Sequence, residues 1–121
     1  MIKTAVITGG SSGIGRETAK LLSENGFMVF EFSRSGRNEG KVRHLTVDVT
    51  NEAQVAAAME QVFAQTGRLD LLVNNAGMGI SGAAEFTELE DAKRIFDVNF
   101  FGVLLCSKQA LKYLRQTPKS Q

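Results

Sequence analysis

Apolar residues along this chain alternate between short runs typical of β-strands and longer segments with a helical period. Four short runs, at 4–8, 28–33, 45–47 and 71–73, are rich in β-branched, aromatic or aliphatic residues. Most of the sequence between them carries apolar residues every three or four positions. This alternation predicts an α/β fold in which helices cover the faces of a parallel sheet.

The first helical segment follows the run at 4–8, which is almost wholly apolar, as is typical of a strand buried on both faces. We expect the helix to begin near Ile14 and to run to about Asn25, with Gly26 as its stop. Its apolar residues recur at helical spacing and are expected to face the sheet. This predicted inner face consists of Ile14, Thr18, Leu21 and Leu22.

A second helix is expected after the run at 45–47. Thr50 can cap its N-terminus, Glu52 sits in its first turn, and the helix should end before Gly67. The segment 35–41 is too short for a crossover helix, so we predict a turn or at most one helical turn there. The apolar stripe of the second helix consists of Val55, Met59, Val62 and Phe63.

A long third helix is predicted from the Thr-Glu-Leu-Glu stretch at 87–90, which matches a capping box, to about Leu114. Gly102 within it permits the close approach of a neighbouring element. A stripe of apolar residues runs along the helix, and we interpret it as core packing, with a partner surface as the alternative. The stripe consists of Phe96, Phe100, Val103, Leu104, Leu111 and Leu114.

Composition and charge restrict the class of protein. The chain has 121 residues, 43% hydrophobic and 22% charged, and a net charge of +1, which is typical of one globular domain without a general attraction for nucleic acid or a membrane. With no signal-peptide core or spanning segment, a cytoplasmic location is expected. Cys106 and His44, the single residues of their types, lie far apart, so we predict no metal site and an inert helical cysteine.

The stretch Thr-Gly-Gly-Ser-Ser-Gly-Ile-Gly at 8–15 joins the first strand to the first helix. Such a junction points backbone N–H groups and the positive helix end at a ligand, and phosphate is the natural one. The spacing from Gly10 to Gly15 fits an NTPase phosphate loop, but Arg16-Glu17 follow where that loop needs lysine and a hydroxyl residue. A literal G-x-G-x-x-G is also absent. A dinucleotide is therefore favoured, with a ligand-free glycine turn as the alternative.

Four motifs together resemble the short-chain dehydrogenase/reductase family. They are Thr-Gly-x-x-x-Gly-Ile-Gly after the first strand, Asp48 after the third, Asn-Asn-Ala-Gly at 74–77 after the fourth, and Asp-Val-Asn-Phe-Phe-Gly at 97–102. The resemblance covers essentially the whole chain. It implies one NAD(P)-binding domain at 1–121, a Rossmann-like doubly wound parallel sheet of strand order 3-2-1-4, truncated relative to the family. Without it, Asp48 would read equally well as a loop or capping residue, and the asparagine pair as a turn.

The resemblance also implies which residues would hold the cofactor. The glycine turn would surround the adenosine ribose and the pyrophosphate, the end of the third strand would hold the adenine edge, and the asparagine motif would lie along the adenosine side and support the sheet. The residues so assigned are Gly9, Ser11, Ser12, Gly13, Ile14 and Gly15 in the turn, Asp48 and Val49 after the third strand, and Asn75, Ala76 and Gly77.

Cofactor preference can be argued from charge at the end of the second strand. An acidic residue there accepts the ribose 2′-hydroxyl of NAD(H), whereas a 2′-phosphate requires a cation and no acid. Ser33 stands where NAD-preferring relatives carry aspartate, and Arg34 follows, with Arg37 as a second possible contact. NADP(H) is therefore predicted, and the alternative is that these are solvated turn arginines.

Most of the family's catalytic group has no match here. Relatives use a serine on a following strand and a Tyr-x-x-x-Lys pair, but Tyr113 is followed four residues later by Thr117, and Ser81 lies before the long helix. Asn99 alone matches, and the resemblance suggests that it supports the lysine through a helix distortion and a water molecule. We therefore expect negligible activity from these 121 residues alone.

The favoured hypothesis is the cofactor-binding N-terminal portion of an oxidoreductase that interconverts carbonyls and alcohols. The alternative is a stand-alone, non-catalytic nucleotide-binding or interaction module. The strand at 71–73 would lie at a sheet edge, and with the long helix it is expected to promote self-association. The substrate cannot be read from the sequence, although the stretch 78–86 could border its pocket.

Overall fold

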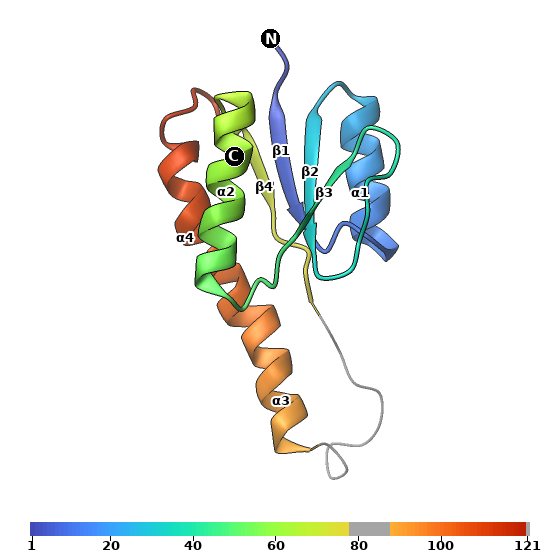
Figure 1. Ribbon diagram of the computed structural model, residues 1–121, viewed down its shortest axis with the longest axis vertical. Coiled ribbons are helices and arrows are strands. Elements are labelled where there is room, and N and C mark those ends of the chain that lie inside the picture. The colour runs from blue at the N-terminus through green and yellow to red at the C-terminus, as the bar shows by residue number, and fades with distance from the viewer. Residues whose placement is uncertain (78–87, 121) are drawn as a thin grey trace.

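Four parallel strands form a sheet in the order β3-β2-β1-β4 (Figure 1). The computed structural model describes residues 1–77 and 88–120. The strands are β1 (Thr4–Thr8), β2 (Met28–Ser33), β3 (Arg43–Thr46) and β4 (Leu71–Val73). The strand order confirms the predicted sheet, and β4 pairs only with β1 among the described residues, which leaves it at an edge as expected.

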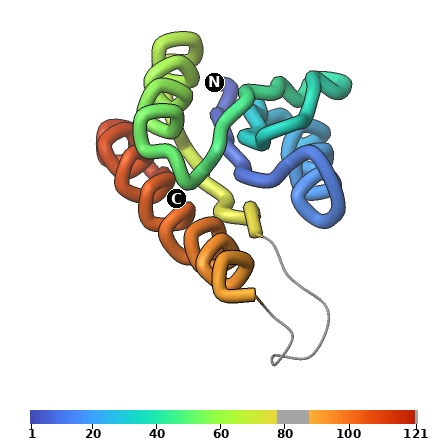
Figure 2. Tube along the Cα trace, turned by 60° about the horizontal axis from the view of Figure 1, so that its bottom comes forward, coloured from blue at the N-terminus to red at the C-terminus, as the bar shows by residue number. Residues whose placement is uncertain are grey.

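Helices cover both faces of this sheet. One face carries α1 (Gly13–Glu24), and the other carries α2 (Glu52–Thr66) and α4 (Gly102–Leu114), which lie side by side in Figures 1 and 2. A hydrophobic core lies on each face of the sheet, and neighbouring residues of β1 pack into different cores. Val6 lies in the larger core, under α2 and α4, and Ile7 lies in the smaller core, under α1. This alternation follows from the two-residue period of a strand.

The inner face predicted for α1 is only partly correct, because Leu22 packs against the core under this helix but two other members of the face do not. Ile14 is 80% exposed and Leu21 60% exposed, whereas Gly15 and Ala19 are buried. The helix is rotated because Gly15 lies against Gly9, where a side chain would collide with the Gly9 carbonyl. Close packing of the two glycine backbones, rather than the apolar pattern, therefore sets which face is buried.

Helix α2 follows the prediction except at its cap. Asn51, not Thr50, is the N-cap, and its side chain accepts a hydrogen bond from the Gln54 N–H at 3.1 Å. The helix ends at the left-handed Gly67 as expected. The segment 35–41 contains no helix, which confirms the predicted turn; its end pairs in an isolated bridge between Glu39 and Val42.

The long helix consists of three parts. Helix α3 (Leu89–Phe96) is followed by a π-helical turn, η2 (Asp97–Phe101), and then by α4, and in Figure 1 α3 projects beyond the end of the sheet. Its N-cap is Glu88, while Thr87 of the predicted capping box lies outside the described residues.

The interpretation of the apolar stripe as core is wrong for most of its members. Side chains buried on α4 instead include Cys106 and Ala110, which belong to the core shared with α2. Of the stripe, Leu114 packs against the core. The stripe residues that are exposed are Phe96, Phe100, Val103, Leu104 and Leu111.

Candidate cofactor-binding site

The carboxyl ends of the parallel strands meet at one edge of the sheet, and the glycine turn crosses it after β1. Gly9 has a left-handed φ of 68° and donates its N–H to the Phe32 carbonyl at 2.8 Å. A Cβ atom at Gly9 would lie 2.9 Å from Ala76 Cα. A side chain at either Gly9 or Gly15 would therefore disrupt the turn, whereas Gly13, with a φ of 56°, borders open space.

The N-terminus of α1 is arranged to receive an anion. Ser12 is its N-cap in extended conformation, but the serine side chain makes no capping hydrogen bond. No acidic residue lies in the first helical turn, and Ser12, Gly13 and Ile14 are exposed. The positive end of the helix and the Ser12 hydroxyl are thus available to a phosphate.

The end of β4 is bound directly to this turn. The Thr8 hydroxyl accepts hydrogen bonds from the N–H groups of Asn75 at 3.0 Å and Ala76 at 2.9 Å. Asn99 in the π-turn lies near Gly77, with its Oδ1 3.1 Å from the position of a Cβ built there. The fold therefore brings together the predicted residues Asn75, Ala76, Gly77 and Asn99.

Asp48 and Val49 follow β3 and occupy different environments. Asp48 Oδ1 accepts two hydrogen bonds from Thr50, from the hydroxyl at 2.6 Å and from the N–H at 3.0 Å. These bonds lower the pKa of Asp48, and the charge of Arg34 lowers it further, so the group is a carboxylate at neutral pH. Val49 is buried, and its Cγ2 would lie 2.8 Å from a Cβ built at Gly102. Asp48 is the more accessible of the pair to a ligand.

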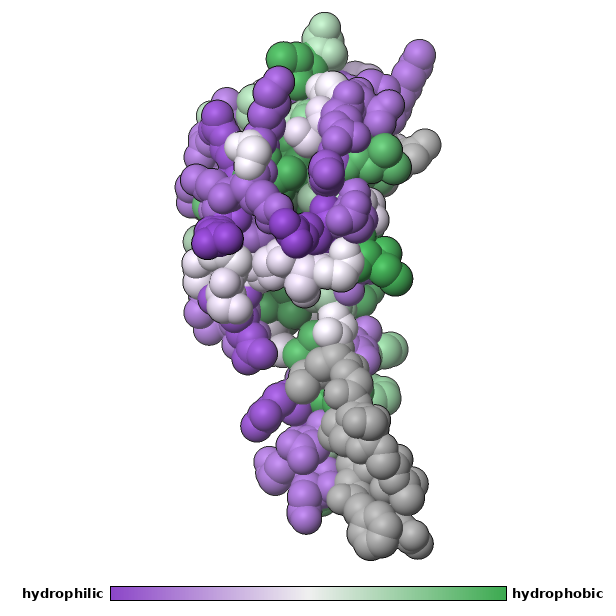
Figure 3. Space-filling model, turned by 90° about the vertical axis from the view of Figure 1, so that its right-hand side faces the viewer, coloured by the Kyte–Doolittle hydropathy of each residue, from purple (hydrophilic) through white to green (hydrophobic). Residues whose placement is uncertain are grey.

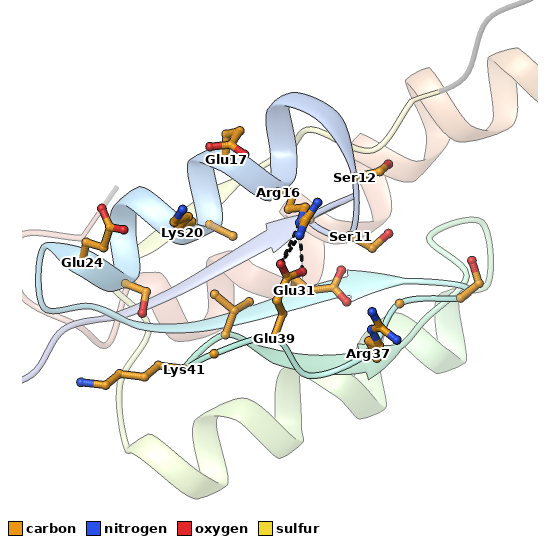
Figure 4. Close-up of a pocket in the computed structure, with 17 residues that line it drawn as sticks. Ser11, Ser12, Arg16, Glu17, Lys20, Glu24, Glu31, Arg37, Glu39 and Lys41 are labelled. Atoms are coloured by element: carbon orange, nitrogen blue, oxygen red, sulfur yellow. Dashed lines mark hydrogen bonds and ion pairs between the residues drawn. The ribbon is translucent and has the colours of Figure 1, made fainter.

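Ser33 and Arg34 lie where β2 ends, beside a cleft between α1 and the segment 35–42. Ser33 is half-buried and Arg34 is exposed. The cleft has a volume of about 1010 Å³, and Ser11, Ser12 and Arg37 are among its lining residues (Figure 4). In Figure 3, which faces this side of the molecule, polar side chains predominate over the surface.

Two features of this cleft were missed by the sequence prediction. Arg16 of α1 binds Glu39 across it, with Nε 2.9 Å and 3.0 Å from the two carboxylate oxygens, and this contact lowers the pKa of Glu39. Glu31 lies buried at the floor. The sequence did contain a signal for Glu31, since it is the one charged residue of the otherwise mostly apolar strand β2. The side chains that surround it could not be known without the fold.

Other titratable groups lie away from this edge. Burial raises the pKa of the Cys106 thiol to about 11, which keeps it protonated at neutral pH, as expected of an inert residue.

Within residues 1–77 and 88–120, no group of three or more histidine, cysteine, aspartate or glutamate side chains is placed to hold a metal ion. No helix in those ranges is long and apolar enough to cross a membrane. Ser81 and the whole stretch 78–86, which the sequence suggested as a border of the substrate pocket, fall outside the described residues.

Comparison with known proteins agrees with this architecture. The model of the short chain dehydrogenase family matches residues 3–121, and the chain belongs to that family. It is 47% identical over 117 residues to the 3-ketodihydrosphingosine reductase of Bacteroides thetaiotaomicron, an alignment that covers 96% of this chain and 44% of the relative.

Two solved structures have the same fold with different cofactors. ElxO with NADP bound superposes with a TM-score of 0.87 at 32% identity, covering 96% of this chain and 52% of that one. The 3-ketoacyl-(acyl-carrier-protein) reductase from Brucella melitensis, complexed with NADH, superposes with a TM-score of 0.86 at 32% identity, covering 94% and 50%. The chain thus spans about half the length of the relatives that it matches, and the family supports a nicotinamide dinucleotide as cofactor.

Proposed function

We propose that residues 1–121 are the NADP(H)-binding portion of an oxidoreductase that interconverts a carbonyl and an alcohol. The observation that carries the proposal is the glycine turn at the uncapped, acid-free N-terminus of α1, beside the exposed Arg34. The turn would receive the pyrophosphate, while Ser11 and Ser12 would add hydroxyl donors. The bound nicotinamide would supply the hydride acceptor or donor.

Preference for NADP(H) is proposed from the end of β2. Arg34 is exposed, and Ser33 takes the place of the acid that selects the ribose hydroxyl of NAD(H). A charged hydrogen bond contributes about 1.5–3 kcal/mol, which corresponds to about one to two orders of magnitude in affinity. Arg37, in the wall of the adjoining cleft, is a second cation within the same region.

The remaining predicted residues are proposed to shape this site. Ionised Asp48 would accept a hydrogen bond at the adenine edge, and Val49 would support it through its packing on Gly102. Asn75, Ala76 and Gly77 would hold the adenosine side in register with the turn. Asn99 is proposed as the member of the catalytic group that this chain contributes.

The proposed reaction for the whole protein is ketone reduction, and the name of the Bacteroides relative suggests 3-ketodihydrosphingosine as the first substrate to test. The family serine and Tyr-x-x-x-Lys pair have no counterpart in residues 1–121. A general acid typically contributes about 10²–10⁴-fold to a rate. These residues alone are therefore proposed to bind the cofactor without measurable turnover.

Self-association is proposed through the exposed aromatic side chains of α3 and η2. The rings of Phe96 and Phe100 stack, and the Phe101 ring packs edge-on against both, with centroid separations of 5.1–6.0 Å. Each of the three residues is at least 45% exposed. Such a patch favours burial against another apolar surface.

The experiment is an NADPH oxidation assay with 3-ketodihydrosphingosine, performed on the natural full-length protein and on residues 1–121 in parallel, with cofactor binding followed by fluorescence. We expect binding by both and turnover by the full-length protein alone. Failure of both to bind NADPH would contradict the proposal, and turnover by residues 1–121 would contradict the assigned division of roles.

A further inference from the structure

A glutamate is buried in the middle of β2, on the face of the sheet that α1 covers. Glu31 is 1% exposed, and its neighbours Phe30 and Phe32 belong to the core on the opposite face. Removing a carboxylate from water is costly unless charges and hydrogen bonds compensate it. The position therefore requires a specific environment.

Only one of the two carboxylate oxygens of Glu31 has polar partners that compensate its burial. Its Oε1 accepts a hydrogen bond from the Ser33 hydroxyl at 3.0 Å and also contacts His44 Nδ1. The other histidine nitrogen lies 2.8 Å from Thr46 Oγ1, which holds the ring in place. Among the residues that the structure describes, the buried Oε2 has no hydrogen-bond partner. The side chain is thus incompletely compensated.

Glu31 is also next to the proposed cofactor site. A Cβ atom at Gly10 would lie 2.5 Å from Glu31 Cβ, so the carboxylate side chain packs directly beneath the glycine turn. In Figure 4 it lies between the turn that carries Ser11 and the segment that carries Arg37. The hydrogen bond from Ser33 also shows that the Glu31 carboxylate lies next to the end of β2, where serine stands in place of the acid of NAD-preferring relatives.

We propose that Glu31 is a specificity-determining residue that opposes the 2′-phosphate of NADP(H) and so limits the preference for it over NAD(H). This inference rests on the proposed function. A buried carboxylate repels a nearby phosphate through a medium that screens weakly, whereas a ribose hydroxyl carries no charge to repel. Arg34 and Arg37 attract the same phosphate, so the selectivity of the site is the difference between two opposing effects.

The test replaces the charge of Glu31 while keeping its shape. Glu31→Gln, in the natural full-length protein, is titrated calorimetrically with adenosine 2′,5′-bisphosphate and with 5′-AMP, two ligands that differ only in the 2′-phosphate. We expect the ratio of the two affinities to shift about tenfold toward the bisphosphate. A merely structural role for Glu31 would change both affinities alike, so an unchanged ratio overturns the inference.

The matched control is Glu24→Gln, which removes the same charge from the exposed far end of the same cleft and should leave the ratio within about twofold. If Glu31→Gln does not fold, Glu31→Met provides a second neutral side chain of similar size and is expected to give the same shift. Failure of the unchanged protein to bind either ligand would contradict the proposed function. Binding with a ratio unaltered by both substitutions would contradict the role of Glu31 alone.

Discussion

Asn75 donates a hydrogen bond from its side-chain amide to the carbonyl oxygen of Gly9 at 3.1 Å. This bond joins the end of β4 to the glycine turn after β1, 66 residues earlier in the chain. It holds the turn against the edge of the sheet where the cofactor is proposed to bind. The geometry of the glycine turn therefore depends on a side chain from the end of β4 as well as on the residues of the turn itself.

Asn75→Ala removes this bond and leaves the Gly9 carbonyl without that donor. We expect the free energy of unfolding to fall by about 1 kcal/mol and the affinity for NADPH to fall about fivefold. Thermal denaturation and fluorescence titration measure the two effects. Asn25→Ala removes a comparable bond, from Asn25 to Leu21 at the far end of α1, and should leave NADPH affinity unchanged. Equal loss of affinity in both variants would contradict the account.

Arg34→Ala tests the proposed 2′-phosphate contact. The substitution should weaken NADPH binding about 10- to 100-fold, while NADH affinity stays within about twofold, because only NADPH carries the charged group. The control is Arg43→Ala, which removes an exposed arginine from β3. If NADPH and NADH affinities fell together in Arg34→Ala, the arginine would not be a 2′-phosphate ligand.

Asp70 makes the stability of the fold sensitive to acid. It is 4% exposed, Arg68 binds it with Nε 2.7 Å from Oδ2, and the Thr4 N–H donates to it at 2.8 Å. The Arg68 hydrogen bond lowers the pKa of Asp70 below its ordinary 3.8. The unfolded chain therefore binds the proton more tightly, so this contribution is complete above about pH 4 and is lost as pH falls through the folded-state pKa.

Asp70→Asn should accordingly destabilise the protein at pH 7 by about 3 kcal/mol and reduce the loss of stability on acidification below pH 4. Urea denaturation between pH 2.5 and 7 measures both. Glu60→Gln, on the exposed side of α2, is the control and should follow the unchanged protein. A parallel acid dependence in Asp70→Asn would show that other groups determine it.

Phe96→Ser combined with Phe100→Ser tests the proposed self-association. Both side chains are more than half exposed, so the monomer should keep its fold while the apolar patch is lost. Sedimentation velocity should show a shift toward monomer. Leu21→Ser removes an apolar side chain of similar exposure from α1 and should have no such effect. An unchanged distribution in the double variant would exclude this patch as the interface.

The strand order and the gathering of the predicted site residues at the carboxyl edge of the sheet could be predicted, because both follow from patterns that are visible in the sequence itself. Alternating strand and helix periods indicated the layers, and the resemblance of four motifs indicated the order 3-2-1-4. The resemblance also assigned Asn75 and Ala76 to the cofactor side of the sheet, and the structure adds that both donate hydrogen bonds to the Thr8 hydroxyl.

The errors have local physical causes that the apolar pattern does not contain. The rotation of α1 comes from the backbone contact of Gly15 with Gly9, which a hydrophobic period cannot indicate. The long helix carries apolar residues on more than one face, and a hydrophobic period cannot indicate that Cys106 and Ala110, rather than the exposed stripe, pack in the core. The surroundings of Glu31 depend on His44, from a different strand, 13 residues away in sequence.

The most direct test of the account is an equilibrium fluorescence titration of the unchanged protein with NADPH and NADH under identical conditions. The glycine turn and Arg34 predict that both cofactors bind and that NADPH binds more tightly, by up to about 100-fold, less the reduction ascribed to Glu31. Equal or tighter binding of NADH would contradict the assigned preference, and no binding of either would contradict the cofactor site itself.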